Sequence, residues 1–220
     1  MYDFDFRVFA QHADAFWYGL GTTLLLAFGA SIAGTVAGLP LGAVLRLPAF
    51  AWMRVLNDTV RAIPVLVLML LAYYAPYTAL GLPPVSRCGG AFFGLLAAQA
   101  VYTADLFRSA VDGVSQQTAL AARALGLKRH EVWRYIILPD VLRTMFPTLV
   151  AFTIGNIHLS SLGAAVGCQE VMWVAMTTGE NTFRAFEALL IVAAIYMVIV
   201  VSFGLGARWL ERRDWLRRHG

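Results

Sequence analysis

Residues 155–162, G-N-I-H-L-S-S-L, place a histidine beside two serines inside an apolar part of the chain. His158, Ser160 and Ser161 are residue types that a hydrolase uses as base and nucleophile. The serines stand too close to His158 on one helix to face it as a catalytic pair, and no third group orients them. The sequence therefore does not predict an intramembrane hydrolase.

Motifs for a nucleotide, a metal or a redox centre are missing as well. The sequence has no G-x-x-x-x-G-K-[ST] loop, no H-E-x-x-H and no C-x-x-C. We therefore predict that the chain is not an enzyme and has no cofactor or metal of its own.

His158 has two interpretations. Ionisable residues inside a membrane segment are costly and usually face a bundle interior or a wet cavity. His158 is either a neutral histidine bonded to a neighbouring helix or a residue that contacts a transported substrate. In the second case Asn156, Ser160 and Ser161 are uncharged hydrogen-bonding groups that could line the same path.

Two cysteines, Cys88 and Cys168, are both predicted to lie toward the outer side of the membrane. A disulfide between them would be stable in an oxidising compartment. We nevertheless expect two free thiols in packed or loop positions.

Membrane spans are the elements that must position these residues. The 220-residue chain is 60% hydrophobic and 14% charged, whereas an ordinary soluble domain has about 25% charged residues. A span needs roughly 20 apolar residues, and five uncharged windows meet or approach that length: 15–45, 62–86, 88–104, 144–169 and 188–207. We predict an all-α membrane protein of one domain, with five transmembrane helices and a core over residues 15–212.

Several local patterns refine these spans. Asp105 and Arg108 stand three apart and can pair on one helix face, which extends the third span. Pro64 either kinks the second span or lies in its first turn. Small residues recur every four positions in the first span, which predicts a close helix contact within the chain or at a subunit interface. They are Ala30, Gly34, Gly38 and Gly42.

Basic residues set the orientation. With five spans, one side holds only Arg7, Arg87 and Arg184 of the 17 Lys and Arg residues, and the other side holds the remaining fourteen. Because positive residues mark the cytoplasmic side, the N-terminus is predicted to lie outside and the C-terminus inside, near anionic lipid headgroups. The first apolar run lacks a cleavage site and is expected to be retained.

Residues 114–139 form the one long polar segment between the first and last apolar runs. Alanines at helical spacing lead to Gly126, and a second amphipathic turn leads to Pro139, which we expect to end it. The pattern predicts two short cytoplasmic helices with a bend at Gly126. A simple connection would be shorter and would need no amphipathic pattern, so this segment is predicted to dock a partner.

The run A-A-R-A-L-G at 121–126, followed by Ile137, Leu138 and Pro139, resembles the EAA loop of ABC importer permeases. In that family the loop forms a coupling helix that docks on a cytoplasmic ATPase. The resemblance implies a coupling role for a set of seven residues. They are Leu120, Ala121, Ala122, Arg123, Gly126, Leu138 and Pro139. Leu120 stands where the family usually has glutamate, so no contact that needs that carboxylate is implied.

Other motifs resemble the polar amino-acid uptake branch of that family. Tyr102, Asp105 and Arg108 match its Tyr–acidic–Arg pattern, and Arg61 with Pro64 resembles its Arg-Gly-Thr-Pro turn. Residues 158–162 resemble a K-D-T-S-L stretch near the transport path, with His158 and Leu159 in place of the two charged residues. Residues 167–170 resemble a G-x-x-E motif whose Glu170 is expected to cap or anchor an outer helix rather than touch substrate.

The resemblance implies a permease subunit of the bacterial inner membrane that forms the path for a polar amino acid or close analogue. It implies four partners: an ABC ATPase dimer that holds ATP and magnesium, a second permease subunit of the same or a sister chain, an extracytoplasmic substrate-binding protein, and membrane lipid. No nucleic acid is expected. The alternative is a secondary transporter or membrane scaffold without an ATPase, although such a transporter would be expected to show internal repeats and acidic residues within its spans.

Overall fold

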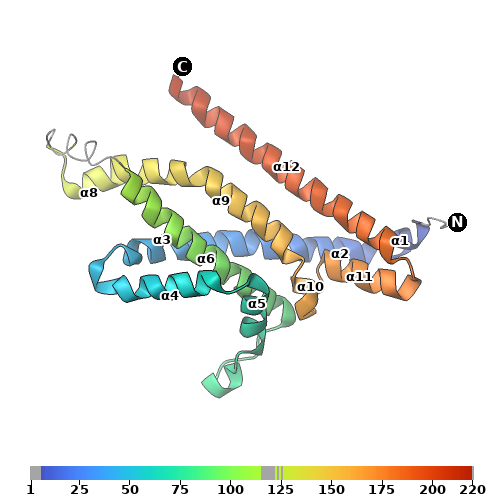
Figure 1. Cartoon of the computed structure of the whole chain (residues 1–220). Helices are drawn as coiled ribbons and strands as arrows, with labels where there is room; N and C mark the ends of the chain where they lie inside the picture. Colours follow the sequence, from blue (N-terminus) through green and yellow to red (C-terminus); the bar gives the residue numbers. More distant parts are fainter. Residues whose placement is uncertain (1–5, 115–121, 123, 125, 220) are drawn as a thin grey trace.

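The computed structural model describes residues 6–114, 122, 124 and 126–219. This part of the chain is helical and contains no strand (Figure 1), which confirms the all-α prediction. The α-helices are α1 (Arg7–Gln11), α2 (Ala13–Leu24), α3 (Ala30–Leu45), α4 (Ala51–Ala62), α5 (Val65–Tyr74), α6 (Arg87–Gly113), α8 (Arg129–Val132), α9 (Leu138–Ser160), α10 (Gly163–Val166), α11 (Val171–Thr182) and α12 (Ala185–His219).

Four continuous helical segments of the described chain are long and apolar enough to cross a membrane: Ala13–Leu45, Arg87–Gly113, Arg129–Ser160 and Ala185–Glu211. The first joins α2 to α3 through a π-helical turn at Leu25–Gly29, and the third joins α8 to α9 through another at Trp133–Ile137. A fifth span arises if Pro48–Ala62 and Val65–Tyr74, which meet at a bend of 102°, are counted together. The five-span prediction holds in this form.

The second span differs from the predicted helix over 62–86. Ile63 is extended, with a ψ of 128°, because a residue that precedes a proline is disfavoured in the helical region. Pro64 is therefore the N-cap of α5 and separates it from α4. Ala75, which precedes Pro76, is likewise extended and ends α5 after ten residues.

The fourth span was also predicted with the wrong limits. The helix that contains it runs from Arg129 to Ser160, so the predicted window 144–169 starts inside this helix and extends past its end. Pro139 does not end a helix, because the Leu138 N–H donates to the Trp133 carbonyl, five residues back. Such a widened turn lets the helix continue past a proline that has no N–H to donate.

The predicted close contact of the first span is confirmed within this chain, where α3 packs against α6. A Cβ added at Gly38 would lie 2.5 Å from the Ala100 carbonyl oxygen, and one at Gly42 would lie 2.5 Å from that of Ala104. No side chain fits between the two backbones at these points. α6 packs against α5 by the same means, since a Cβ at Gly94 would lie 2.6 Å from the Met69 backbone nitrogen.

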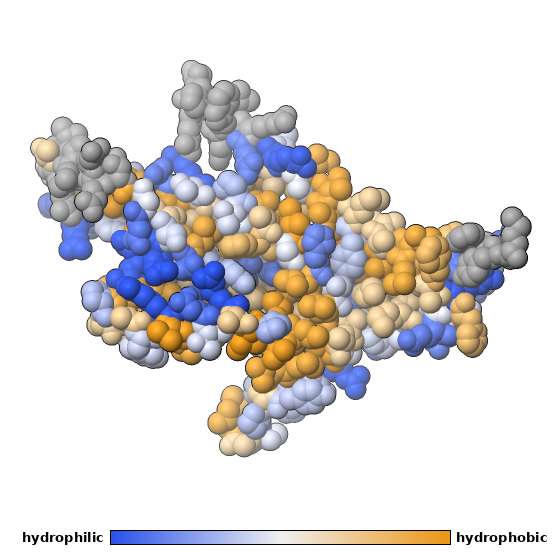
Figure 2. Space-filling model, viewed as in Figure 1, coloured by the Kyte–Doolittle hydropathy of each residue, from blue (hydrophilic) through white to orange (hydrophobic). Residues whose placement is uncertain are grey.

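The surface agrees with a membrane location. Figure 2 shows hydrophobic residues over the middle of the molecule and hydrophilic residues gathered around α4 and the end that carries α8. Large apolar side chains along α12 are exposed, among them Leu190, Met197 and Val201. A face of this kind needs lipid or another protein against it.

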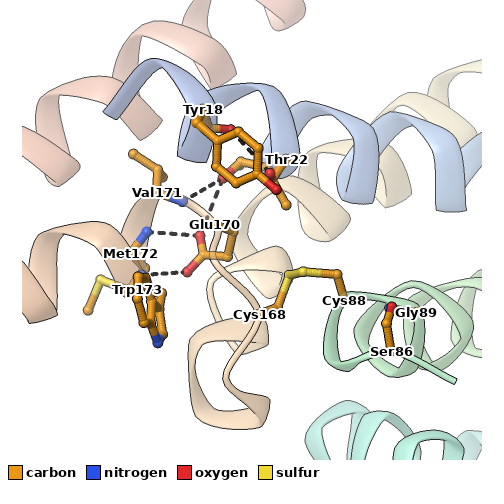
Figure 3. The surroundings of a disulfide bond; sticks show 11 residues. Tyr18, Thr22, Ser86, Cys88, Gly89, Cys168, Glu170, Val171, Met172 and Trp173 are labelled. Carbon is orange, nitrogen blue, oxygen red and sulfur yellow. Dashed lines mark hydrogen bonds between the residues drawn. A yellow bond between two sulfur atoms is a disulfide. The ribbon is translucent and has the colours of Figure 1, made fainter. Parts of the chain in front are cut away.

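A disulfide joins Cys88, in the first turn of α6, to Cys168, between α10 and α11 (Figure 3). It lies at the N-terminal end of α6, away from the end that leads toward α8. The expectation of two free thiols was wrong. Gly167 adopts a left-handed φ of 80° at the end of α10, and this turn brings Cys168 beside α6.

Glu170 caps the next helix, as expected. Its carboxylate accepts hydrogen bonds from the backbone N–H groups of Met172 (2.9 Å) and Trp173 (2.8 Å) at the start of α11 (Figure 3). The hydroxyls of Thr23 and Tyr196 also donate to it, so it joins α11 to α2 and α12. Burial raises the pKa of the Glu170 carboxyl, although the two backbone donors oppose that shift.

Replacing Gly38 by alanine tests the contact between α3 and α6. The added Cβ would overlap the Ala100 carbonyl, so Gly38→Ala should lower the free energy of unfolding by about 1–3 kcal/mol. Gly21→Ala is the matched control, because nothing lies within 4 Å of that position, and it should be neutral or slightly stabilising. Thermal unfolding in detergent measures both; equal effects of the two substitutions would contradict the close contact.

The disulfide predicts a simple labelling result. Because the chain has two cysteines and they are paired, the denatured protein should take up no maleimide before reduction and two maleimides after it. A gel-shift assay with maleimide-polyethylene glycol reads this directly. Labelling without a reductant would show that the thiols are free.

Candidate functional site

The resemblance implied a coupling role for seven residues, and three of them, Leu120, Ala121 and Arg123, lie outside the described residues. Ala122 is buried. Gly126 has a φ of 86°, and the Leu127 N–H donates to the Ala122 carbonyl at 3.2 Å. A left-handed glycine with this hydrogen bond is the geometry with which a helix ends at a C-terminal glycine. The predicted bend at Gly126 is therefore present.

After the bend, α8 begins at a polar cap, where the Lys128 N–H donates to the Glu131 carboxylate at 2.6 Å. Leu138 is exposed and Pro139 is half-buried. A surface hollow of about 570 Å³ lies beside them. It is lined by Arg129, His130, Trp133, Arg134 and Leu138.

The four residues predicted for the transport path do not share one face. Asn156 and Ser160 are buried, Ser161 is half-buried, and His158 is exposed on the surface of the chain. The two serine hydroxyls donate to carbonyls of their own helix, Ser160 to Ile157 and Ser161 to His158, both at 2.7 Å. Ser160 also hydrogen-bonds with the Tyr196 side chain of α12, and Asn156 contacts side chains of α3 and α6.

Asn156 lies at the centre of a polar network that joins three helices. Its amide nitrogen donates to the Ser31 hydroxyl at 2.9 Å and to the Gln99 amide oxygen at 3.1 Å. The Gln99 amide nitrogen in turn donates to Thr35 at 3.2 Å and to Thr103 at 3.4 Å. Buried amides held in this way are fixed in orientation before any ligand arrives.

Asn156 and Gln99 both line a cavity of about 250 Å³ between α5, α6 and α9. None of the described residues that line it is charged, and its polar groups are the two amides and Tyr102. The full lining is Val65, Ala98, Gln99, Tyr102, Ala151, Phe152, Gly155, Asn156 and Leu159. His158 is not among the residues that line it. Gln99 was not predicted from the sequence, although an amide within an apolar window pointed to it.

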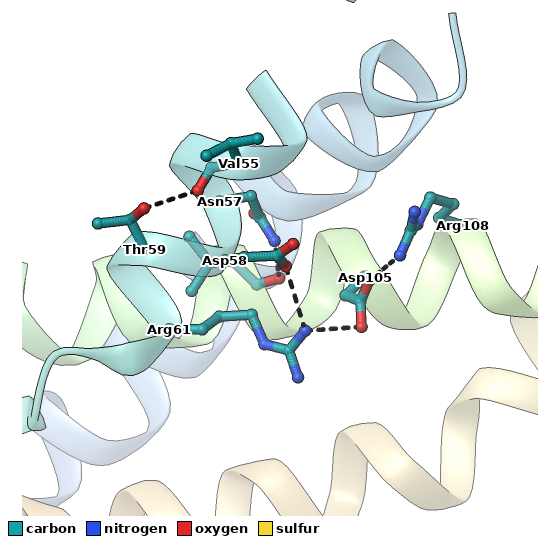
Figure 4. A network of polar contacts seen from close by, with 8 residues as sticks. Val55, Asn57, Asp58, Thr59, Arg61, Asp105 and Arg108 are labelled. Atoms are coloured by element: carbon teal, nitrogen blue, oxygen red, sulfur yellow. Dashed lines mark hydrogen bonds and ion pairs between the residues drawn. The ribbon is translucent and has the colours of Figure 1, made fainter. Parts of the chain in front are cut away.

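A chain of charges lies next to this cavity (Figure 4). The Asp105 carboxylate pairs with Arg108 at 2.7 Å, as predicted, and also with Arg61 at 2.9 Å. Arg61 contacts Asp58 at 3.7 Å, and its guanidinium lies over the Tyr102 ring, 5.1 Å from the centroid. Tyr102 therefore separates the uncharged cavity from a half-buried ion-pair network that ties α4 to α6.

Comparison with known proteins identifies the architecture. Residues 30–214 match the family described as binding-protein-dependent transport system inner membrane component. The chain belongs to this family. It is 32% identical over 203 residues to a probable amino-acid ABC transporter permease of Bacillus subtilis, covering 89% of this chain and 87% of that one. It is 30% identical over 224 residues to a glutamate/aspartate import permease of Escherichia coli, covering 97% and 99%.

Solved structures agree with the family. The fold superposes on a crystal structure of an amino acid ABC transporter with histidines at a TM-score of 0.87 and 26% identity, covering 96% of this chain and all of that one. A methionine ABC transporter in an inward-facing conformation shares the fold at a TM-score of 0.75 and 19% identity, covering 92% and 97%. The predicted family, an ABC importer permease of the amino-acid type, is confirmed, and the chain is a multi-pass inner-membrane protein.

The amide network makes a prediction for this permease. Asn156→Leu removes the donor to Gln99 and leaves its buried amide oxygen unpaired, which should cost about 1–3 kcal/mol of stability. It should also lower uptake in proteoliposomes, because an amide is lost from the cavity. Thr153→Val is the control, since that hydroxyl donates to its own helix at Leu149 and does not line the cavity. Uptake by Asn156→Leu equal to that of the control would exclude the cavity from the path.

Proposed function

We propose that this permease forms, with a second permease subunit of the same or a sister chain, the membrane path for a polar amino acid or a close analogue. The observation that carries the proposal is the cavity beside Asn156, Gln99 and Tyr102, where buried amides meet an apolar wall at the middle of the helix bundle. Pockets of this kind, mostly apolar with a few fixed polar groups, are typical of small-molecule sites. The amino-acid transporters among its relatives support the substrate class.

The lining favours a substrate with an uncharged side chain. The α-ammonium and α-carboxylate that every amino acid carries have opposite charges and can offset each other, whereas an ionised side chain adds a charge that needs a partner of its own. The described lining residues supply no such partner. The ion-pair network beyond Tyr102 uses the Asp105 carboxylate to hold two arginines, so that charge is already engaged. An amide or hydroxyl side chain can instead exchange hydrogen bonds with Asn156 and Gln99.

Energy for transport is proposed to come from a separate ATPase dimer that binds ATP and magnesium and docks on the loop that contains Gly126. The left-handed turn at Gly126 and the hollow beside Trp133 support this proposal, because together they present a shaped and basic surface to a partner. A substrate-binding protein is proposed to deliver the amino acid from the other side.

The disulfide supports the proposed orientation. Structural disulfides persist in oxidising compartments such as the periplasm. Cys88 is in the first turn of α6, whereas the far end of α6 leads into the loop at Gly126. If the disulfide end lies outside, the loop lies in the cytoplasm, the N-terminus outside and the C-terminus inside.

Gly126→Val tests the coupling proposal in the reconstituted complex. A β-branched residue is strongly disfavoured at a φ of 86°, so the bend should deform, and both ATPase assembly and ATP-driven uptake should fall at least tenfold. Gly113→Val is the matched control, because this glycine ends α6 at the other side of the same loop, in open space and without a positive φ.

Two outcomes would refute this assignment. Full ATP-coupled uptake by Gly126→Val would remove the loop from the coupling mechanism. Uptake by the purified permease without any nucleotide-binding partner would favour a secondary transporter instead.

A further inference from the structure

Phe183 lies in the turn between α11 and α12, and it has an unfavourable backbone conformation and an almost fully exposed side chain. Its φ of 57° and ψ of 30° are left-handed, and the other positive-φ positions of the described chain are all glycines, Gly81, Gly126 and Gly167. Residues with a Cβ are disfavoured in this conformation, whereas glycine is not. The Phe183 residue is nevertheless 92% exposed, so packing within the chain does not explain the phenylalanine.

The surrounding turn is held firmly. The Arg184 N–H donates to the Gly179 carbonyl at 2.9 Å, and the Arg184 side chain pairs with the buried Glu187 at 3.1 Å. A Cβ added at Gly179 would lie 2.9 Å from Ala185, so α11 and α12 touch at this corner. The direction of the Phe183 Cα–Cβ bond is therefore set by the turn.

Exposed apolar residues continue from Phe183 along α12. Phe186, Leu190, Met197, Val201 and Leu205 are all exposed and recur at nearly helical spacing. They lie within the membrane-spanning part of α12, Ala185–Glu211, so this face is suited to lipid. Phe183 stands at its outer end.

An aromatic residue also marks the inner end of the same span. Trp209 is 53% exposed, and at 1.5 Å per residue it lies roughly 36 Å along the helix from Ala185. That length falls between the hydrocarbon thickness of about 30 Å and the full bilayer thickness of about 40–45 Å. The two rings are thus spaced to reach the two interfacial layers. Trp concentrates there, and Phe is among the apolar residues that bury at the boundary of headgroups and acyl chains.

We propose that Phe183 is a membrane-interface anchor whose ring lies at the boundary between headgroups and acyl chains of outer-leaflet phospholipid. The anchor would fix the outer end of α12 and, through the corner at Gly179 and Ala185, the position of α11. It explains why an aromatic residue stands where the backbone favours glycine. The inference rests on the membrane span and on the proposed orientation, but not on the proposed substrate or coupling mechanism.

Depth measurements test where the side chain lies. Because Cys88 and Cys168 are bonded to each other, Phe183→Cys introduces a single free thiol for a spin label. The assembled transporter would be placed in phosphatidylethanolamine–phosphatidylglycerol nanodiscs and probed with oxygen and an aqueous nickel reagent. Asn181→Cys, at the exposed end of α11, is the control for water, and Leu190→Cys, on the exposed face of α12, is the control for hydrocarbon.

The ratio of oxygen to nickel accessibility at position 183 should fall between the two controls. A ratio equal to that at position 181 would place the side chain in water and overturn the proposal. A loss of both accessibilities on adding substrate-loaded binding protein would show a protein contact and would overturn it as well.

Two substitutions separate an anchor from an ordinary turn residue. Phe183→Gly relieves the left-handed conformation, so a residue with no outside contact should give a higher Tm in nanodiscs. The anchor predicts the opposite sign, a Tm lower by several degrees, while Phe183→Trp keeps the parent value because its ring also suits the interface. A higher Tm for Phe183→Gly, with uptake unchanged, would refute the anchor whatever the permease transports.

Discussion

The close approach of α3 and α6 is the constraint on which the arrangement of the other helices depends. Inside a bilayer there is no water to satisfy buried polar groups, so helices must satisfy them for each other. The glycines at 34, 38 and 42 allow the two backbones to approach until the Thr35 hydroxyl of α3 accepts a hydrogen bond from the amide of Gln99 on α6. Asn156 of α9 then completes the network, and a cavity remains beside it. The close approach of α3 and α6 therefore accounts for both the helix packing and the polar network beside the cavity.

Hydropathy and small-residue spacing predicted most of the architecture, because both follow from local sequence. The helical class, the membrane spans, the contact at Gly38, the pair Asp105–Arg108 and the cap at Glu170 all came from residues close together in the chain. The break within the second span was not predicted, and the reason for this is also local. A hydropathy window averages over Pro64 and Pro76, whereas the backbone is interrupted before each of them.

Contacts between distant residues could not be predicted in the same way. The disulfide joins residues 80 apart, and the hydrogen bond from Arg61 to Asp105 joins residues 44 apart. For α9, which is largely apolar around its circumference, spacing alone could not show that Asn156 faces the bundle while His158 faces outward. Deciding the direction of a side chain required the neighbouring helices. His158 was singled out because placing an ionisable side chain inside a membrane is costly. The side chain that contacts α3 and α6 is instead the uncharged amide of Asn156.

The π-helical turn at Leu25–Gly29 has a consequence for evolutionary comparison. It holds one residue more than an α-helical turn, which offsets all later positions by about 100° around the axis. Gly19, before the turn, lies against Val171 of α11, and Gly34, after it, lies against α6. A homologue with an uninterrupted α-helix in the first span must align with this chain through a one-residue gap inside that turn. Gain or loss of that residue is an insertion or deletion in the middle of a membrane helix. It rotates the half before the turn relative to the half after it.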